Sequence, residues 1–282
     1  MQVSRPAAKA RGTLLLVHGL AGCAASPYLR WTGNLALARG WCIARLDLRG
    51  CGGTEALSLS LHNAAQSEDI DAALGALERA ELPRPYAVAG FSLGANLVLR
   101  ALGCSGAASL ADRAVAVNPP VDLAACADAL ERPSNLLYQA YFLRRLCHLV
   151  RCARTHFEVP GPEASPWRIR TVRRFDTLFT APSGGFTSVE EYYEVASSGR
   201  VIAGVRRPTL VLSAQDDPFV PYTCFPPCHA AAPDDVRFIH PKRGGHVGYW
   251  QSAATRFWAA EAIVAFIASS SPILDAAHLT AP

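Results

Sequence analysis

Short apolar runs recur along the chain, and longer amphipathic stretches separate them. The predicted β-strands are residues 13–17, 42–46, 86–89, 114–117, 209–213 and 236–240. Several of these runs are continuously apolar, as expected for strands that are buried on both faces of a parallel sheet. The predicted helices are residues 67–80, 93–102 and 254–268. Strands that alternate with helices predict a mostly parallel sheet that is flanked by helices on both faces.

One long segment interrupts this alternation. About ninety residues separate Val117 from Thr209, far more than an ordinary crossover connection contains. Residues 135–152 within it have a helical pattern, in which several apolar side chains share one face. We interpret residues 122–203 as a helical cap above the carboxyl edge of the sheet, inserted into a single domain that spans residues 1–282.

Three roles are open for the apolar face of residues 135–152. Phe142, Leu143 and Leu146 are suited to ordinary core packing between the cap and the sheet. Alternatively, part of this face lines a pocket. A membrane-surface role is the third alternative, because arginines flank the apolar side chains.

The composition of the 282 residues supports a large core, because 50% of them are hydrophobic and 18% are charged. The net charge of +4 is small and no dense cluster of lysines and arginines is present, so we expect no nucleic-acid partner. No stretch approaches the roughly 18 to 20 uninterrupted apolar residues of a membrane span, so we expect no integral membrane segment.

The nine cysteines are an odd number. Their spacing matches neither a paired zinc pattern nor a small disulfide framework. The N-terminal residues also lack the apolar core of a signal peptide. These observations predict reduced thiols in a cytoplasmic protein.

The residues Gly90-Phe91-Ser92-Leu93-Gly94 stand between a predicted strand and a predicted helix. A G-x-S-x-G sequence in that context is typical of a nucleophile elbow, a tight turn that exposes a serine hydroxyl at the end of a strand. Such a turn requires small residues two positions before and two positions after the serine. We therefore predict that Ser92 is a nucleophile.

A serine nucleophile needs a base, and the base needs a group that orients it. Asp216 and Asp217 follow the predicted strand at residues 209–213, and His246 lies in a glycine-rich loop after the last predicted strand. The order serine, acid, histidine is typical of hydrolases with a nucleophile elbow. We predict His246 as the base. Asp217 is favoured as the acid because its spacing to Val220-Pro221 fits better, and Asp216 would then brace the loop.

The loop His18-Gly19-Leu20-Ala21-Gly22 follows the first predicted strand. In an H-G-x-x-G loop, the N–H group after the His-Gly pair normally serves as a hydrogen-bond donor to the substrate. We expect the backbone N–H groups of Leu20 and Leu93 to form an oxyanion hole that stabilises a tetrahedral intermediate. His18 is expected to brace the loop and to transfer no proton.

The chain resembles the YheT-like group of α/β-hydrolases, which is related to eukaryotic membrane-anchored lipases and to yeast alcohol acyltransferases. The resemblance covers about residues 13–267. Its motifs around the predicted sheet are His18-Gly19-Leu20, Ser26-Pro27-Tyr28, Arg49-Gly50-Cys51, Gly90-Phe91-Ser92-Leu93-Gly94 with Asn96, Asp216-Asp217-Pro218-Phe219 and Gly244-Gly245-His246-Val247-Gly248. Its motifs in the predicted cap are Arg170-Thr171-Val172-Arg173-Arg174-Phe175-Asp176, Thr180-Ala181-Pro182 and Tyr192-Tyr193.

This resemblance implies an α/β-hydrolase fold and a carboxylic-ester hydrolase with a Ser-Asp-His triad. The family usually has two or three strands before the oxyanion loop. Only about a dozen residues precede Thr13 here, so we expect the first strands to be missing and an edge of the sheet to be exposed. A homodimer that forms through this edge is a further expectation.

The sequence is thus interpreted as a serine hydrolase that cleaves small-molecule carboxylic esters through an acyl-enzyme intermediate. No cofactor and no metal are expected. One alternative is an alcohol O-acyltransferase, which uses the same triad with an alcohol in place of water. The other is a catalytically silent, hydrolase-like binding protein.

Overall fold

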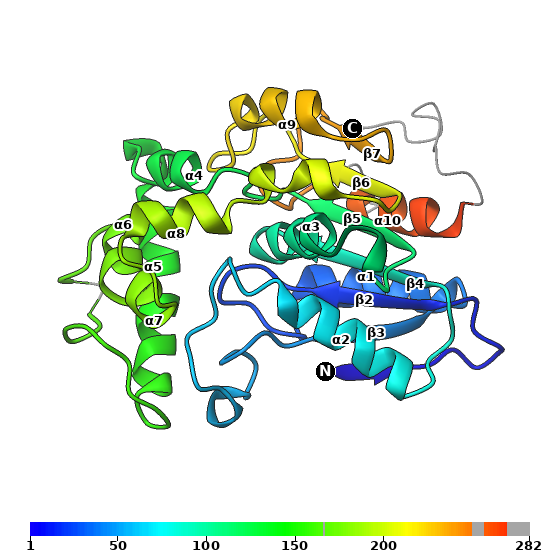
Figure 1. The fold of residues 1–282 in the computed structure, drawn as a ribbon, viewed down its shortest axis with the longest axis horizontal. Coiled ribbons are helices and arrows are strands. Elements are labelled where there is room, and N and C mark those ends of the chain that lie inside the picture. Colours follow the sequence, from blue (N-terminus) through cyan, green and yellow to red (C-terminus); the bar gives the residue numbers. More distant parts are fainter. Residues whose placement is uncertain (166, 250–256, 270–282) are drawn as a thin grey trace.

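The architecture is an open sheet with helices packed against both of its faces (Figure 1). The computed structural model describes residues 1–165, 167–249 and 257–269. Seven strands of these residues form one sheet, in the order β1-β3-β2-β4-β5-β6-β7. They are β1 (Gln2–Ser4), β2 (Thr13–Val17), β3 (Cys42–Leu46), β4 (Tyr86–Phe91), β5 (Arg113–Val117), β6 (Thr209–Leu212) and β7 (Val236–Ile239). The six predicted strands are confirmed with closely similar ends, and these six run parallel to one another.

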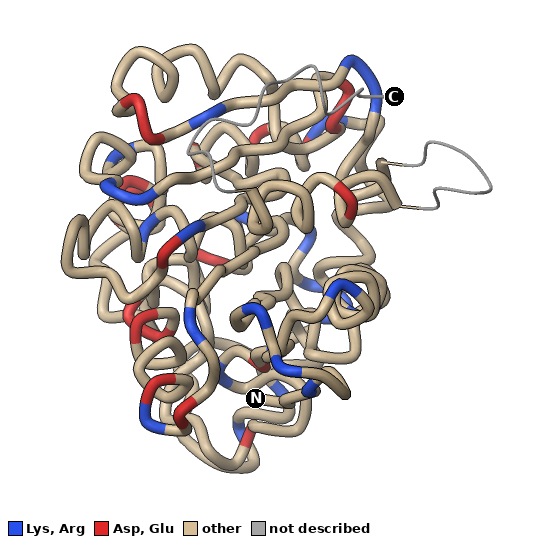
Figure 2. Tube along the Cα trace, turned by 90° about the vertical axis from the view of Figure 1, so that its right-hand side faces the viewer, with Lys and Arg blue, Asp and Glu red and all other residues tan. Residues whose placement is uncertain are grey.

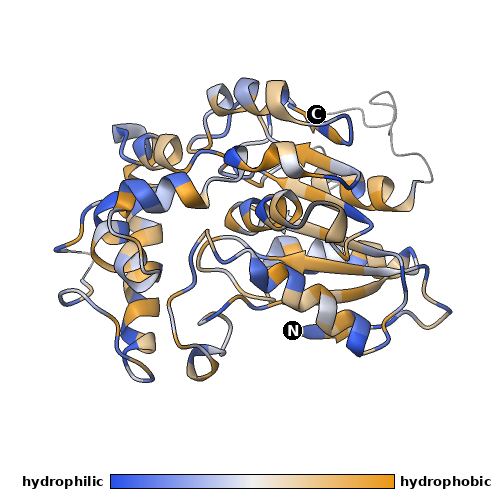
Figure 3. Ribbon diagram, in the orientation of Figure 1, coloured by the Kyte–Doolittle hydropathy of each residue, from blue (hydrophilic) through white to orange (hydrophobic). Residues whose placement is uncertain are grey.

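The helices that flank the sheet are α1 (Pro27–Ala38), α2 (Glu68–Arg79), α3 (Leu93–Ser105), α9 (Phe225–Ala231) and α10 (Trp258–Ala268). Successive strand residues point to opposite faces of a sheet. Accordingly, Leu15 and Val17 pack with residues of α2 and α3, whereas Leu14 and Leu16 pack with residues of α1 and α10. Burial on both faces explains why β2 is apolar at four of its five positions and completely buried, and the central strands are mostly orange in Figure 3. The predicted start of α10 at residues 254–256 lies outside the described residues.

One expectation about the start of the chain is wrong. Residues before Thr13 were expected to add no strand, but Gln2–Ser4 form β1, which pairs antiparallel with β3. Three residues are too few to show a periodic pattern, and Gln2 and Val3 are exposed, so the sequence carries no hydrophobic signal for this strand. Strand β1 therefore covers the edge of β3 that was expected to be open, and pairing of two copies there stays a prediction.

Residues 122–203, which we call the helical segment, connect β5 to β6. The segment contains α4 (Leu123–Leu130), α5 (Leu136–Ala153), α6 (Val172–Phe175), a single π-helical turn η4 (Asp176–Thr180), α7 (Ala181–Ser183) and α8 (Val189–Ala196). Figure 1 shows these helices gathered at one end of the sheet. Asn96 of α3 anchors the segment, because its amide donates to the carbonyl oxygen of Ala196 at 2.9 Å and its oxygen accepts the N–H of Ser198 at 2.9 Å.

Charged residues of both signs are interspersed along the chain (Figure 2), in line with the small net charge. Among the described helices, none combines the length and the apolar character that crossing a membrane requires.

Candidate active site

Ser92 lies in the tight turn between β4 and α3. Its backbone has a φ of 52° and a ψ of −121°, in the left-handed region that residues other than glycine seldom adopt. The flanking glycines are sterically required. A Cβ atom at Gly90 would lie 2.3 Å from the carbonyl oxygen of Gly94, and one at Gly94 would lie 2.4 Å from that of His18. The turn thus holds Ser92 at the carboxyl end of the central strands, and the energy of its strained backbone is offset by the packing around it.

Three side chains from distant parts of the chain meet at this turn. The Ser92 Oγ lies 2.9 Å from the Nε2 of His246. The Nδ1 of the same ring lies 2.7 Å from the Oδ2 of Asp217. This contact fixes the neutral ring with its proton on Nδ1, which leaves Nε2 as the acceptor for the serine hydroxyl. A serine, histidine and carboxylate connected in this way can perform nucleophilic acyl transfer.

The side chain of Asp217 accepts several hydrogen bonds inside the protein. Its side chain is fully buried. The Oδ1 atom accepts the N–H groups of Phe219 and Val220, at 3.1 and 3.0 Å. The Oδ2 atom also accepts a hydrogen bond of 2.6 Å from the amide of Asn118. Three hydrogen bonds besides that of His246 keep this carboxylate in one orientation.

The neighbouring Asp216 has a different contact. Its Oδ1 accepts the N–H of Gly245 at 2.7 Å, so it fixes the loop that carries His246 without touching the ring.

Asn118 is a contributor that the sequence analysis did not identify. It follows β5 directly, has a φ of 48° and is completely buried. Besides contacting Asp217, its amide donates to the carbonyl oxygen of Gly245, and its oxygen accepts the N–H of Val247. One side chain thus connects the acid to the histidine loop. The only sequence signal for it is its position at the carboxyl end of a central strand, where sites of α/β sheets lie.

The loop after β2 is braced by His18 and Tyr28. The N–H of Leu48 donates to the His18 Nε2 at 3.1 Å, so the proton of the neutral ring is on Nδ1, which donates to the carbonyl oxygen of Gly19 at 2.7 Å. Burial lowers the pKa of His18, which keeps its ring neutral. The N–H of Gly19 donates to the hydroxyl of Tyr28 at 3.0 Å.

Leu20 and Leu93, the predicted donors of the oxyanion hole, line the same cavity as Ser92. Leu93 is the first residue of α3, so its N–H belongs to the helix-terminal groups that have no acceptor within the helix. The dipole of α3 also favours negative charge at this end. Leu20 sits in a turn closed by the N–H of Gly22 and the carbonyl oxygen of Gly19, at 3.0 Å.

Arg145 of α5 contacts this loop from the helical segment. Its Nε donates to the carbonyl oxygen of Ala21 at 3.0 Å, and its terminal nitrogen donates to the same oxygen. Ala21 has a φ of 52° and follows Leu20 directly. This contact could not be predicted from the sequence, because the two residues are 124 positions apart.

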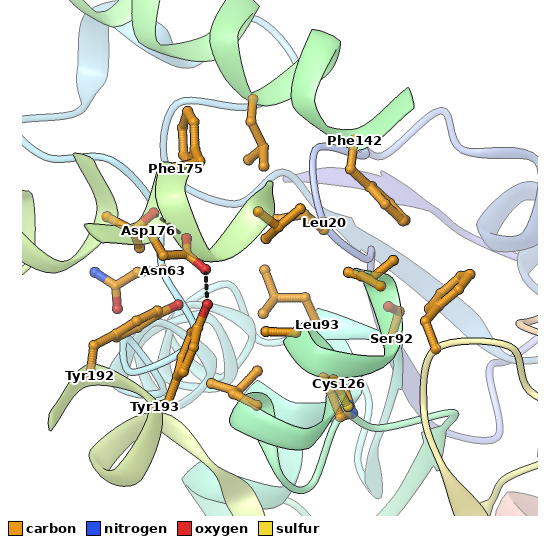
Figure 4. Close-up of a pocket in the computed structure, with 18 of the residues that line it drawn as sticks. Leu20, Asn63, Ser92, Leu93, Cys126, Phe142, Phe175, Asp176, Tyr192 and Tyr193 are labelled. Carbon is orange, nitrogen blue, oxygen red and sulfur yellow. Dashed lines mark hydrogen bonds between the residues drawn. The ribbon is translucent and has the colours of Figure 1, made fainter. Parts of the chain in front are cut away.

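Two recesses meet at Ser92 and His246. The first is an apolar cavity between the sheet and the helical segment (Figure 4). Its apolar lining includes Leu20, Leu93, Leu130, Phe142, Leu146, Val172, Phe175 and Phe219. The second recess is bounded by the loop of residues 19–28 and by Tyr141 and Arg145 of α5, and it is the more polar of the two. Leu20 and Phe142 line both recesses.

The fold and this site define an α/β hydrolase. The family model described as "alpha/beta hydrolase fold" matches residues 12–253, so the chain belongs to that family. Within it, the putative esterase YheT of Escherichia coli is 32% identical over 240 residues, which cover 84% of this chain and 70% of that protein. The resemblance to the YheT-like group is thereby confirmed.

Eukaryotic proteins are similar as well. The monoacylglycerol lipase of Saccharomyces cerevisiae is 30% identical over 92% of this chain. The phospholipase ABHD3 of Mus musculus is 30% identical over 86% of this chain. The chain spans 59% of the length of each of these two relatives. The names of these relatives support a hydrolase of the α/β type.

Solved structures support the same fold. The monoacylglycerol lipase of Paleococcus ferrophilus superimposes with a TM-score of 0.59 and 18% identity, over 96% of this chain and 99% of that one. A 2,6-dihydroxy-pseudo-oxynicotine hydrolase superimposes with a TM-score of 0.67 and 16% identity, over 97% of this chain and 67% of that one. At such identities the likeness concerns the fold alone.

Proposed function

We propose that the chain is a serine hydrolase that cleaves carboxylic esters, with Ser92, His246 and Asp217 as its catalytic triad. The observation that carries this proposal is the continuous pair of contacts from Ser92 Oγ to His246, at 2.9 Å, and from His246 to Asp217, at 2.7 Å. It lies at the junction of an apolar cavity and a more polar recess. That combination suits a molecule with one apolar and one polar half joined by a reactive carbonyl group.

The chemistry follows from the contacts. The Ser92 oxygen attacks the ester carbonyl carbon while His246 takes the hydroxyl proton at Nε2. The N–H groups of Leu20 and Leu93 stabilise the oxygen anion of the tetrahedral intermediate. His246 then returns the proton to the leaving alcohol, and an acyl-enzyme on Ser92 remains. Water then attacks the acyl carbon while His246 takes one of its protons. The bond between the acyl carbon and the Ser92 oxygen breaks, His246 gives the proton to that oxygen, and the carboxylic acid leaves.

We assign the two halves of the ester to the two recesses. The apolar cavity takes the acyl chain, because aliphatic and aromatic side chains bury methylene groups there. The recess beside Tyr28 and Arg145 takes the alcohol and opens its exit path. In this arrangement the helical segment acts as a cap, since α4, α5 and η4 supply much of the acyl wall.

The named relatives support ester cleavage as the shared activity, since their names are esterase, monoacylglycerol lipase and phospholipase. Acyl transfer to an alcohol is the second candidate. It is favoured by the medium-chain fatty acid ethyl ester synthase/esterase 2 of Saccharomyces cerevisiae, which is 26% identical over 90% of this chain.

Product analysis tests both candidates. The purified protein is incubated with 4-nitrophenyl esters of C4 to C12 acids, with and without ethanol, and the products are separated. Free acid in both incubations identifies a hydrolase, whereas ethyl ester as the main product identifies an acyltransferase. Absence of any turnover would contradict both candidates and favour a binding protein.

A further inference from the structure

The end of the acyl cavity that lies away from Ser92 is polar. The hydroxyl of Tyr193 donates to the Oδ2 of Asp176 at 2.8 Å, and that of Thr180 donates to the Oδ1 at 2.6 Å. All three residues line the cavity. Figure 4 shows Asp176 and Tyr193 on one side of the cavity and Ser92 on the other, with Leu20 and Leu93 between them.

The local backbone explains how a carboxylate reaches this position. Asp176 and Thr180 begin and end the π-helical turn η4, and both side chains face the cavity. Single π-helical turns are frequent at functional sites because they re-aim side chains. Tyr193 approaches from α8, so the polar group is assembled from two separate helices of the segment.

Fold stability does not explain this carboxylate. Burial raises the pKa of Asp176 to about 6, against the opposing effects of its two hydrogen bonds and of Arg173. The guanidinium of Arg173 donates to Asp128 at 2.5 Å instead of pairing with Asp176. The charge of Asp176 is desolvated, its two hydrogen bonds come from neutral hydroxyls, and the attraction of Arg173 is too weak to offset the effect of burial. Such a charge destabilises the fold, and an apolar residue would fill the same space at lower cost.

The same wall of the cavity has spare hydrogen-bonding capacity. A carboxylate has about four acceptor sites, of which Tyr193 and Thr180 occupy two. Asp176 keeps some accessible surface, and it is among the residues that line the cavity. His62 also lines the cavity, and its buried Nε2 has no hydrogen-bond partner among the described residues. Burial lowers the pKa of this ring to about 4, so it is neutral.

We propose that Asp176 and its neighbours bind a hydroxyl group on the acyl chain, so that the preferred substrates are esters of hydroxylated aliphatic acids. This inference rests on the proposed function. A hydroxyl donates to the carboxylate and stays uncharged, so no second charge has to be desolvated. A carboxyl group on the chain would be repelled by Asp176, and a methyl end would leave the acceptor sites empty.

Binding to the Ser92→Ala variant tests the inference without requiring turnover. Dissociation constants are measured for 4-nitrophenyl esters of C6 to C12 acids, each with and without a terminal hydroxyl. One hydrogen bond to a charged group predicts about ten-fold tighter binding of the hydroxylated ester at the matching chain length. Equal or weaker binding of the hydroxylated ester at every length would overturn the inference.

Kinetics of the wild type keep the two proposals separate. The ratio of kcat/KM for the hydroxylated and the plain ester is expected to be about ten at the matching length. Hydrolysis of both esters at equal rates overturns the acyl-hydroxyl inference and leaves the proposed function standing. If the hydroxylated ester binds more tightly but the wild type hydrolyses neither ester, the acyl-hydroxyl inference stands and the proposed function is contradicted.

Two variants locate the effect. Asp176→Leu removes the acceptor and is expected to lower the hydroxyl-to-plain ratio about ten-fold. Asp128→Asn is the matched control, because Asp128 is also a carboxylate near Arg173 but does not line the cavity. A ratio that Asp176→Leu leaves unchanged, or that Asp128→Asn lowers equally, would contradict the assignment of the hydroxyl site to Asp176.

Discussion

The guanidinium of Arg145 donates two hydrogen bonds to the carbonyl oxygen of Ala21, one of them at 3.0 Å. The residue before Ala21 is Leu20, whose N–H is one of the two donors proposed for the oxyanion hole. A side chain of the helical segment therefore helps to set the direction of a backbone group in the loop after β2. Arg145 is a positioning residue for the oxyanion hole, since it acts on Leu20 through the loop, and its side chain also lines the recess proposed for the alcohol.

The first prediction follows from that contact. Arg145→Met should lower kcat roughly ten- to hundred-fold with a much smaller change in KM, because a displaced donor weakens binding of the transition state more than binding of the ester. Arg151→Met, on the same helix but exposed, is the control. An equal loss in both variants, or a change confined to KM, would contradict a positioning role.

The two adjacent aspartates should differ strongly. Asp217→Asn removes the acceptor that fixes the Nδ1–H tautomer of His246, so kcat should fall by a factor on the order of ten thousand. Asp216→Asn loses only one hydrogen bond to the N–H of Gly245, and its effect should be at least a hundred-fold smaller. Steady-state kinetics of both variants check this order, and the reverse order would make Asp216 the acid.

The raised pKa of Asp176 predicts a pH-dependent stability. In the folded protein this pKa is raised from 3.8 to about 6, so the folded state holds its proton more tightly than the unfolded state. The stability contributed by the protonated form is complete below pH 3.8 and is lost as the pH rises to about 6. Melting temperatures of Asp176→Asn should therefore rise relative to wild type between pH 4 and pH 6.5, and then level off.

The control for this measurement is Asp128→Asn, which removes an exposed carboxylate from the same part of the segment. Its melting temperature should not show this rise relative to wild type. If the difference in melting temperature between Asp176→Asn and wild type does not change across this pH range, burial is not the cause of the raised pKa of Asp176.

Two neighbouring residues of α5, Phe142 and Leu143, allow a pocket role to be distinguished from a core role. Phe142 lines both recesses, whereas Leu143 is 3% exposed and belongs to the core of the segment. Phe142→Ala should change the preference among short and medium acyl esters with little change in melting temperature. Leu143→Ala should cost about 2–5 kcal/mol of stability and leave the chain-length profile alone. If the two variants show the opposite effects, the face of α5 that carries Phe142 belongs to the core and does not line the acyl pocket.

Most of the sheet could be predicted because its central strands are buried on both faces and are therefore largely apolar. The helix at residues 135–152 was recognisable for a similar reason, since its apolar residues share one face, and it corresponds closely to α5. Helix α1 gave a weaker pattern, because its buried face is built largely of small residues, Thr32, Gly33 and Ala36 beside Leu29.

The candidate site was predictable only in part. Ser92, His246 and the aspartate pair are marked by glycines and by positions after strands. Asn118 and Arg145 act through contacts between segments that are far apart in the sequence. Local sequence patterns do not predict such contacts. Asp176 belongs to a motif of the family resemblance, but its place in the cavity depends on how η4 and α8 pack against each other.

The central claim is that Ser92 is an activated nucleophile, and covalent labelling tests it most directly. Wild-type protein treated with a fluorophosphonate should gain one adduct, assigned by peptide mass spectrometry to Ser92. Ser92→Ala should gain none, while its ester hydrolysis falls by a factor on the order of a million and its melting temperature stays near that of wild type. Labelling of Ser92→Ala equal to that of wild type, or ester hydrolysis retained in the clean variant, would contradict the account.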